Sequence, residues 1–297
     1  MCGIGGIMTP AGTEFPVGAV QELWTLLEDR GTHASGICFR WTDSDKPVVI
    51  KDALPASQMV DNVNKCAGLN TTYAFFHTRY TTTGSTTNNG NNHPIVGHDM
   101  IVTHNGVISQ HSTIFNQLGV ERLHQVDSEC INASLKHRST AWLADNIQGS
   151  ISIAWVDITQ NREEVNLFTN GRNPLVVARL TDGSVVWAST LQHIEFAGFE
   201  IEHHFNAQPF KQYKLFRNEE GYVVIDSIIV SDQMREPYVA TMYRHASTYA
   251  QDVGYTTKKK KKERKVRSKA QNQQFYAGMY YDVDEMCWKI AKNRRVI

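Results

Sequence analysis

The 297-residue sequence predicts an α+β domain with a largely antiparallel sheet, and two patterns carry this prediction. Residues 16–31 place apolar side chains at helical intervals, with a proline near the start and a glycine at the end. This is the pattern of an amphipathic helix. From residue 149 the chain runs through apolar segments separated by Gly, Asn and Asp turns, which indicates consecutive strands. Helices followed by a run of strands are typical of an α+β domain.

Shorter elements follow from local composition. Residues 73–77 predict a buried strand, and the polar stretch 81–94 predicts a loop too poor in apolar residues to hold a core position. Residues 100–109 predict a strand, a turn and a second strand, because Asn-Gly is a common hairpin turn. Helical spacing returns over 127–147, and a short helix is expected within 274–292.

The charges of the chain are balanced overall but unevenly distributed. Of 30 basic and 30 acidic residues, nine basic and one acidic lie in the segment 258–269, which leaves 21 basic and 29 acidic elsewhere. Such a basic run is a solvated, flexible segment or a site for nucleic acid or an acidic partner. The sequence contains no stretch of about 20 apolar residues, so it predicts no membrane span.

The cysteines and the N-terminus indicate a reducing, cytoplasmic setting. The five cysteines form no CxxC pair, so a disulfide framework is not expected. The start also lacks the basic and long apolar regions of a signal peptide.

The opening run MCGIGGI allows two interpretations. In the structural one, it is a Gly-rich strand in which Cys2 is a small buried hydrophobe. In the catalytic one, removal of Met1 makes Cys2 the first residue, so that one residue carries both a thiol nucleophile and a free α-amine as its base. An α-amine ordinarily titrates at about pH 8, which suits that task.

Four further stretches supply what such a nucleophile needs, although each has a local explanation. Arg30 could be an ordinary charge at a helix C-terminus, and Arg79 an ordinary strand-end arginine. Residues 104–106 (HNG) could be a hairpin turn, and Asp127 could cap a helix. None of these features identifies a site when it is considered alone.

Their order along the chain does. The motifs MCGI, RGxxxxG, HTRxxTxG, NxHP, HNG and DxE occur in this order within about 130 residues, and the set resembles the class II glutamine amidotransferases, an N-terminal-nucleophile family. Later segments, GSISIAWVD, RNPLV and WAS, are similar to that family as well. The resemblance covers residues 1–230 and implies a four-layer αββα sandwich. Residues 231–297 would form a small C-terminal extension.

The resemblance also implies the roles of individual residues. Cys2 would attack the side-chain amide of glutamine and form a glutamyl thioester, releasing ammonia. The side chain of Asn105 and the backbone N–H of Gly106 would form the oxyanion hole. Glycine at that position also lets the substrate approach the backbone.

The amino-acid end of glutamine would be bound by other motif residues. Arg79 would anchor the carboxylate with its forked donors, assisted by Thr82, and Asp127 would pair with the ammonium. Arg30 would support the catalytic end, and His93 would shape the pocket without transferring protons.

The chain departs from the family at His33, where an aspartate is usual. An imidazole there loses or inverts any ion pair that the carboxylate made, which puts the packing of that loop in question. No GxxxxGK[ST], spaced GxGxxG or HExxH motif is present, so neither a cofactor nor a metal is expected.

The sequence therefore predicts hydrolysis of L-glutamine to glutamate and ammonia. About 65 residues follow residue 230, too few for a synthase domain of the family, so the ammonia acceptor is expected on a separate protein. Two alternatives remain: an amidase acting on another amide or γ-glutamyl substrate, and a non-catalytic module that binds a partner through its basic segment.

Overall fold

The computed structural model describes residues 1–231, except 45 and 161–162, together with residues 275–276, 279–282 and 287–290. The chain divides into two compact units, Met1–Glu236 and Pro237–Ile297. The basic segment 258–269 lies outside the described residues.

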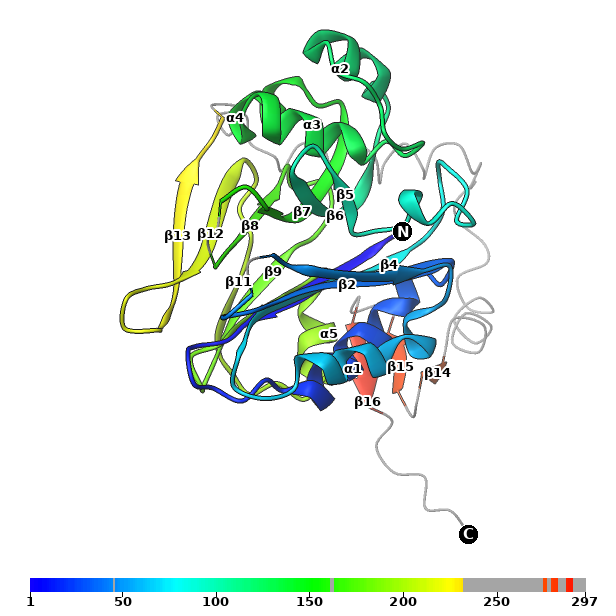
Figure 1. Cartoon of the computed structure of the whole chain (residues 1–297). Coiled ribbons are helices and arrows are strands. Elements are labelled where there is room, and N and C mark those ends of the chain that lie inside the picture. The colour runs from blue at the N-terminus through cyan, green and yellow to red at the C-terminus, as the bar shows by residue number, and fades with distance from the viewer. Residues whose placement is uncertain (45, 161–162, 232–274, 277–278, 283–286, 291–297) are drawn as a thin grey trace, which may run out of the picture. The chain divides into compact units, whose positions relative to one another are not determined.

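Two antiparallel sheets form the centre of the first unit (Figure 1). The first sheet has seven strands in the order β11-β9-β10-β1-β4-β2-β3, which places β1 and β4 side by side near its middle. Its strands are β1 (Gly3–Met8), β2 (Ala34–Trp41), β3 (Val48–Asp52), β4 (Thr71–Arg79), β9 (Val176–Leu180), β10 (Val185–Ala188) and β11 (Ile201–Asn206).

The second sheet has six strands in the order β13-β12-β8-β7-β6-β5. Its strands are β5 (Ile95–Gly97), β6 (Met100–Ile108), β7 (Gly149–Asp157), β8 (Glu164–Thr169), β12 (Lys211–Arg217) and β13 (Val223–Ile229). The expected succession of strands from residue 149 is therefore present, but the chain distributes these strands over both sheets.

Helices cover the outer face of each sheet, which confirms the four-layer αββα sandwich. The helices on the first sheet are α1 (Val17–Leu26) and α5 (Leu191–Phe196), and those on the second are α2 (His111–Leu118), α3 (Glu129–His137) and α4 (Thr140–Asn146). Four 3-10 helices complete the set: η1 (Leu27–Arg30), η2 (Ala56–Gln58), η3 (Val60–Cys66) and η4 (Asn89–Asn91).

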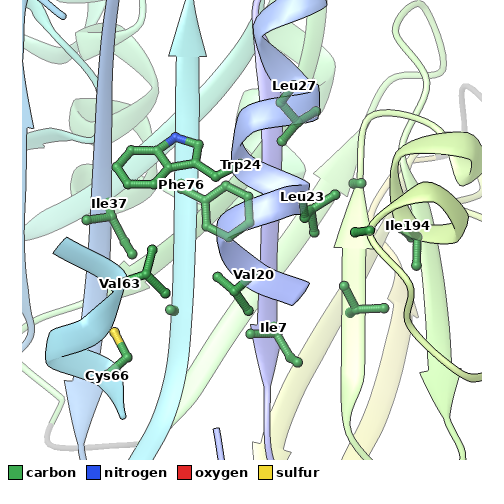
Figure 2. Packing of buried hydrophobic residues seen from close by; sticks show 14 of the residues in the cluster. Ile7, Val20, Leu23, Trp24, Leu27, Ile37, Val63, Cys66, Phe76 and Ile194 are labelled. Carbon is green, nitrogen blue, oxygen red and sulfur yellow. The ribbon is translucent and has the colours of Figure 1, made fainter. Parts of the chain in front are cut away.

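The apolar face of α1 explains why residues 16–31 form a helix at this place. Val20, Leu23 and Trp24 are fully buried and point from α1 onto the first sheet (Figure 2). The ring of Trp24 packs against Phe76 of β4, with ring centroids 5.8 Å apart. The observed α-helix ends at Leu26, earlier than the predicted stretch 16–31, because the residues that follow, Leu27–Arg30, form a 3-10 helix.

The two sheets pack against each other through side chains that alternate along each strand. In β4, Tyr73 and Phe75 face the layer between the sheets, whereas Phe76 faces α1, as expected for a strand buried on both faces. The N-terminal glycines fit this crowding. A Cβ placed on Gly6 would lie 2.3 Å from the Trp187 ring and 2.7 Å from the Ala74 carbonyl oxygen, so only glycine fits there.

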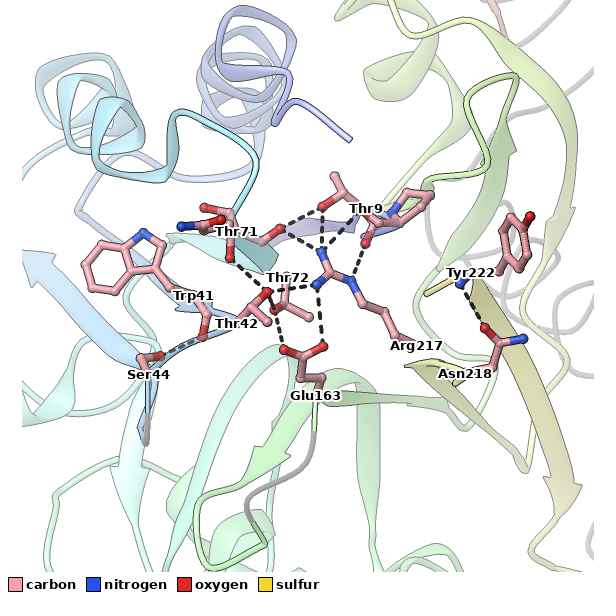
Figure 3. A network of polar contacts seen from close by, with 12 residues as sticks. Thr9, Trp41, Thr42, Ser44, Thr71, Thr72, Glu163, Arg217, Asn218 and Tyr222 are labelled. Carbon is pink, nitrogen blue, oxygen red and sulfur yellow. Dashed lines mark hydrogen bonds and ion pairs between the residues drawn. The ribbon is translucent and has the colours of Figure 1, made fainter. Parts of the chain in front are cut away.

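Arg217 of β12 ties the second sheet to the loops of the first (Figure 3). Its guanidinium donates to the carbonyl oxygens of Thr9 at 2.8 Å and Thr71 at 3.0 Å, and it pairs with Glu163 at 3.5 Å. Thr9 directly follows β1, whereas Cys2 directly precedes it, so this cluster lies at the opposite end of β1 from the thiol. The Cys2 end of β1 takes no part in this cluster.

One predicted turn is wrong. Residues 100–109 do not form two strands with a turn at HNG, because β6 runs without interruption through Asn105 and Gly106. The partner strand β7 explains the difference, since it pairs with β6 from Met100 opposite Asp157 to Ile108 opposite Gly149. Long-range pairing thus overrides the local preference of Asn-Gly for a hairpin.

The prediction for the polar loop 81–94 is wrong in one respect. Asn91, Asn92 and His93 are buried, although the stretch has few apolar residues. The amide side chains fill the interior by bonding to the loop itself: Asn91 Nδ2 donates to the Ser85 carbonyl at 3.0 Å, and Asn92 Nδ2 to the Thr86 carbonyl at 2.8 Å. Satisfied hydrogen bonds are what make burial of polar side chains tolerable.

The expected short helix within 274–292 is also wrong. The described parts of this stretch are three antiparallel strands, β14 (Phe275–Tyr276), β15 (Met279–Asp282) and β16 (Cys287–Ile290), in the order β14-β15-β16. Aromatic residues are frequent in this stretch and favour strands over helices.

Candidate functional site

The Cys2 thiol lies beside the end of β4. The register of β1 against β4 places Gly3 opposite Thr78, so the residue before β1 meets the residues that follow Thr78. The main-chain N–H of Tyr80 donates to Cys2 Sγ at 3.4 Å. Pairing of two strands that are distant in sequence therefore brings the MCGI and HTRxxTxG motifs into contact.

Charges around the thiol oppose one another. Burial raises the pKa of the Cys2 thiol, and the nearby Asp127 carboxylate adds to this effect. The Tyr80 hydrogen bond, the N-terminal charge and the Arg79 guanidinium act in the other direction. Because burial is the largest of these effects, the thiol in this state needs a base to become a nucleophile.

Arg30 holds the main chain of the predicted nucleophile. Its Nε donates to the Cys2 carbonyl oxygen at 2.8 Å, across the gap between the end of η1 and the start of β1. The resemblance implies that this arginine supports the catalytic end, and that role stays a prediction.

Arg79 is 3% exposed, and its terminal nitrogens bind the loop that follows it. Nη1 donates to Asn92 Oδ1 at 2.7 Å, and Nη2 donates to the carbonyls of Thr83 at 2.6 Å and Gly84 at 2.9 Å. Thr82 is exposed, and none of the hydrogen bonds described for the chain joins it to Arg79. Asn92 is thus a partner of Arg79 that sequence reasoning missed, although it lies next to His93 in the NNHP stretch.

Asn105 and Gly106 lie in β6. Asn105 is 1% exposed, and its Nδ2 has no hydrogen-bond partner among the described residues. Gly106 has a φ of +155°, and a Cβ there would lie 1.7 Å from the Ser150 carbonyl oxygen. The close approach of the Ser150 carbonyl therefore requires glycine at position 106, and the Asn105 amide keeps an unused donor among the described residues.

The ladder between β6 and β7 leaves the Gly106 N–H unused. Gly106 is opposite Ile151, whose main-chain N–H bonds to Asn170 Oδ1 at 3.1 Å and whose carbonyl accepts from Asn170 N at 3.1 Å. The N–H and the carbonyl of Ile151 both point toward Asn170 and away from β6. Ile151 and Gly106 therefore form a non-hydrogen-bonded pair. The Gly106 N–H therefore points away from β7.

Asp127 faces the end of β6 instead of capping a helix. Helix α3 has Ser128 at its N-cap position with no side-chain cap, and Asp127 Oδ2 accepts from the Ile108 N–H at 2.8 Å. The local explanation of Asp127 as a capping residue is therefore wrong. The carboxylate is 5% exposed, and its charge acts on both Cys2 and Arg79.

A cluster of three buried histidines adjoins Asn105 through His104, and its other members are His77 and His93. Only His93 among them was predicted as a site residue. His77 stacks on His93 with ring centroids 4.1 Å apart, and His104 lies 6.4 Å from His93. Burial lowers the pKa of His77 to about 3, lowers that of His93 well below its ordinary value, and also lowers that of His104. Neutral rings agree with a role for His93 in shape and not in proton transfer.

His33 stands where the family that the motifs resemble usually has an aspartate, and it makes two contacts in the structure. His33 Nδ1 accepts from the Thr81 N–H at 3.0 Å, and its ring stacks on Tyr80 with centroids 4.9 Å apart. An imidazole thus holds the loop beside Cys2 by a hydrogen bond and a ring contact.

No group of three or more His, Cys, Asp or Glu side chains with metal-binding geometry occurs in the part that the structure describes. Among the same residues, no helix has the length and apolar character needed to cross a membrane. Two cavities, of about 570 and 380 Å³, are lined by strands β11–β13 and by α4 with its neighbours, and no predicted site residue lines either of them.

Comparison with solved structures shows which fold the chain shares. The glutamine phosphoribosylpyrophosphate amidotransferase of B. subtilis, solved with ADP and GMP, matches with a TM-score of 0.61 and 20% identity over 78% of this chain and 50% of that one. A structure described as the allosteric regulatory enzyme of purine biosynthesis matches with a TM-score of 0.60 and 18% identity, over 78% of this chain and 50% of that one. The fold is that of the N-terminal-nucleophile amidotransferases.

A family model matches part of the sequence. Residues 77–195 match the glutamine amidotransferase domain family. This segment makes the chain similar to glutamine amidotransferase domains, and the shared fold agrees with the resemblance of its motifs to the class II family. The chain spans about half the length of the two solved structures, and no curated protein matches it.

Proposed function

We propose that this protein hydrolyses L-glutamine to glutamate and ammonia with Cys2 as the nucleophile. The observation that carries the proposal is the contact between Cys2 Sγ and the Tyr80 N–H at 3.4 Å, which sets the thiol next to Arg79. A nucleophile and a carboxylate anchor at neighbouring positions are what an enzyme acting on an amino-acid side chain requires.

The chemical steps follow from these groups. Once Met1 is removed, the sulfur of Cys2 attacks the side-chain carbonyl carbon of glutamine, and its proton passes through the freed α-amine of Cys2 to the leaving nitrogen. The C–N bond breaks, ammonia leaves, and a glutamyl thioester remains. Water then cleaves the C–S bond, which releases glutamate and restores the thiol.

Two donors would stabilise the tetrahedral intermediate. The unpartnered Nδ2 of Asn105 and the free N–H of Gly106 would receive the negative charge that develops on the carbonyl oxygen. These donors lie in β6 of the second sheet, whereas Cys2 precedes β1 of the first. The site would thus form where the two sheets meet.

Substrate recognition would rest on two buried charges. Arg79 would bind the carboxylate through donors that the loop does not use, since the bonds to Asn92, Thr83 and Gly84 leave its Nε and one Nη1 proton. Asp127 would bind the ammonium through the oxygen that Ile108 does not occupy. Thr82 would contact the substrate directly from its exposed position.

We further propose that the ammonia passes to a synthase on a separate protein. One of the solved structures that this chain resembles is described as an amidotransferase, and the other as an enzyme of purine biosynthesis. The acceptor enzyme is the partner that a co-purification experiment should recover.

The direct test is the stoichiometry of hydrolysis. Purified protein given L-glutamine should produce glutamate and ammonia in equal amounts, and Cys2→Ala should abolish both while circular dichroism stays unchanged. Cys66→Ala is the matched control, since Cys66 is a buried thiol of the α1 core. L-Asparagine and γ-glutamyl anilides should be poor substrates. Hydrolysis of these but not of glutamine would favour a different amidase, and no hydrolysis at all would favour a binding module.

A further inference from the structure

Asn173 makes a contact with the predicted oxyanion hole that its position in the sequence does not suggest. It lies in the loop between β8 and β9, is 8% exposed, and its Nδ2 donates to the main-chain oxygen of Asn105 at 2.8 Å. Because a carbonyl oxygen can only accept, the amide nitrogen must be the atom that faces it.

The carbonyl that Asn173 binds belongs to the same peptide group as the Gly106 N–H. A peptide group is planar, so a hydrogen bond that holds the carbonyl oxygen of Asn105 also fixes the direction of the Gly106 N–H. A bond to the oxygen further polarises the group and strengthens the N–H as a donor. Asn173 thus acts on the Gly106 N–H without touching the ligand that it would bind.

Asn173 is itself held in place by the second sheet. Its carbonyl oxygen accepts from Ser152 Oγ of β7 at 2.8 Å and from Thr169 Oγ1 of β8 at 3.2 Å. These bonds fix the loop against the strands that pair with β6. The side chain of Asn173 is therefore presented to β6 in one orientation.

A second side chain holds the preceding peptide group. His77 Nε2 donates to the His104 carbonyl oxygen at 3.0 Å, and that carbonyl shares a peptide group with the Asn105 N–H. The peptide groups on both sides of the Asn105 Cα are thus held, one from β4 of the first sheet and one from the β8–β9 loop. The direction in which the Asn105 side chain leaves the backbone follows from these two planes, and its Nδ2 has no partner among the described residues.

We propose that Asn173 is a positioning residue of the oxyanion hole, which orients and polarises the Gly106 N–H toward the substrate. This inference rests on the proposed glutamine hydrolysis and names a residue that acts through another. Its effect should therefore appear in turnover and not in substrate binding.

The test compares Asn173→Ala with Asn166→Ala in the full chain. Asn166 is a similarly buried asparagine (6% exposed against 8%) on β8, and its side chain bonds to Glu164 and Gln212, away from β6. Asn173→Ala should lower kcat by roughly tenfold with little change in KM, less than the roughly 10²–10³ typical of losing a donor that touches the oxyanion. Asn166→Ala should leave kcat unchanged.

Two further readouts separate positioning from loss of folding. A glutamine analogue with a γ-aldehyde forms a tetrahedral adduct with a thiol, so its affinity should fall in Asn173→Ala by the same factor as kcat, whereas the affinity for L-glutamate should not. The amide proton of Gly106 should also shift upfield in the NMR spectrum of Asn173→Ala, because its peptide group loses a polarising bond.

The outcomes are distinct. Wild-type kcat in Asn173→Ala, or an equal loss of aldehyde and glutamate affinity, would overturn the inference while the proposed function stands. If wild-type protein does not hydrolyse glutamine, the proposed function fails, and the Gly106 resonance then decides: an unmoved amide proton overturns the inference, and an upfield shift supports the polarised peptide group by itself.

Discussion

Tyr80 joins the predicted nucleophile to the predicted carboxylate anchor. Its main-chain N–H donates to Cys2 Sγ at 3.4 Å, and it directly follows Arg79 in the chain. Because Tyr80 contacts the thiol and is bonded directly to Arg79, the peptide bond between Arg79 and Tyr80 keeps the two predicted functional groups near each other. This spacing is what would hold the side-chain amide of glutamine over the sulfur while its carboxylate is bound.

The α-amine of Cys2 should be essential. Since burial raises the pKa of the Cys2 thiol, little thiolate forms at neutral pH without a base. We expect mature protein to begin at Cys2, and protein that retains Met1 to turn over glutamine at least ~10² more slowly, the scale of general base catalysis. Intact-mass analysis together with activity provides the measurement. A fully active enzyme that retains Met1 would contradict this mechanism.

Arg79→Lys should mainly weaken substrate binding. Lysine keeps the positive charge but cannot make the bonds to Asn92, Thr83 and Gly84 while also binding a carboxylate. We expect KM to rise by about tenfold or more while kcat changes little. Arg138→Lys is the control, because the side chain of this exposed arginine bonds to the neighbouring His137 carbonyl and not to a predicted site residue. Loss of kcat with an unchanged KM would assign Arg79 to the chemical step instead.

Asn105→Ala should do the opposite. The Nδ2 of Asn105 has no partner among the described residues, so its removal should cost little folding free energy. We expect kcat to fall by roughly 10²–10³, or about 2.7–4 kcal/mol of transition-state stabilisation, with KM nearly unchanged. Steady-state kinetics and thermal unfolding measure the two effects. A rise in KM alone would show that the amide binds the ground state.

His77 should destabilise the protein in acid. Burial lowers its pKa to about 3, from an ordinary 6.5, so between these pH values the unfolded chain binds a proton that the folded chain does not. The free energy of unfolding should therefore fall as pH falls through this range, by up to about 1.4 kcal/mol per pH unit for this residue.

The variant His77→Gln isolates that effect. Glutamine keeps an amide donor that can reach the His104 carbonyl, but it does not titrate. Urea unfolding at pH 4 to 7 should show a shallower pH dependence for the variant, by about one proton. Parallel curves for variant and wild type would mean that His77 does not titrate in this way.

Basal hydrolysis should not require the basic segment 258–269. The compact unit Met1–Glu236 contains every predicted site residue, and Ser231 Oγ still bonds to Asp145 within it at 2.6 Å. Protein that ends between residues 236 and 257 should keep glutamine hydrolysis but lose binding to an acidic partner or nucleic acid. In the full chain, that binding should weaken steeply with salt. Loss of hydrolysis in a truncated protein that remains folded would place the tail in the active site.

The sequence by itself determined the elements whose signal is local. The apolar spacing of residues 16–31 predicts α1, and the turn residues after 149 predict the run of strands, because both patterns depend on neighbours within a few positions. The order of the motifs from Cys2 to Asp127 likewise indicates the family without any knowledge of the fold. Each helix, strand or motif is defined by residues close together in the chain, and the order of the motifs can be followed along the sequence without the fold.

Only the tertiary structure decided the rest, because the partners are far apart in sequence. Asn105-Gly106 is a strand and not a turn, since β7 pairs along its whole length about 50 residues later in the chain. Asn91 and Asn92 are buried because the loop satisfies their amides. Asn173 reaches the Asn105 carbonyl across a separation of 68 residues, and no local pattern encodes a hydrogen bond that forms only when two sheet neighbours and a loop are in place.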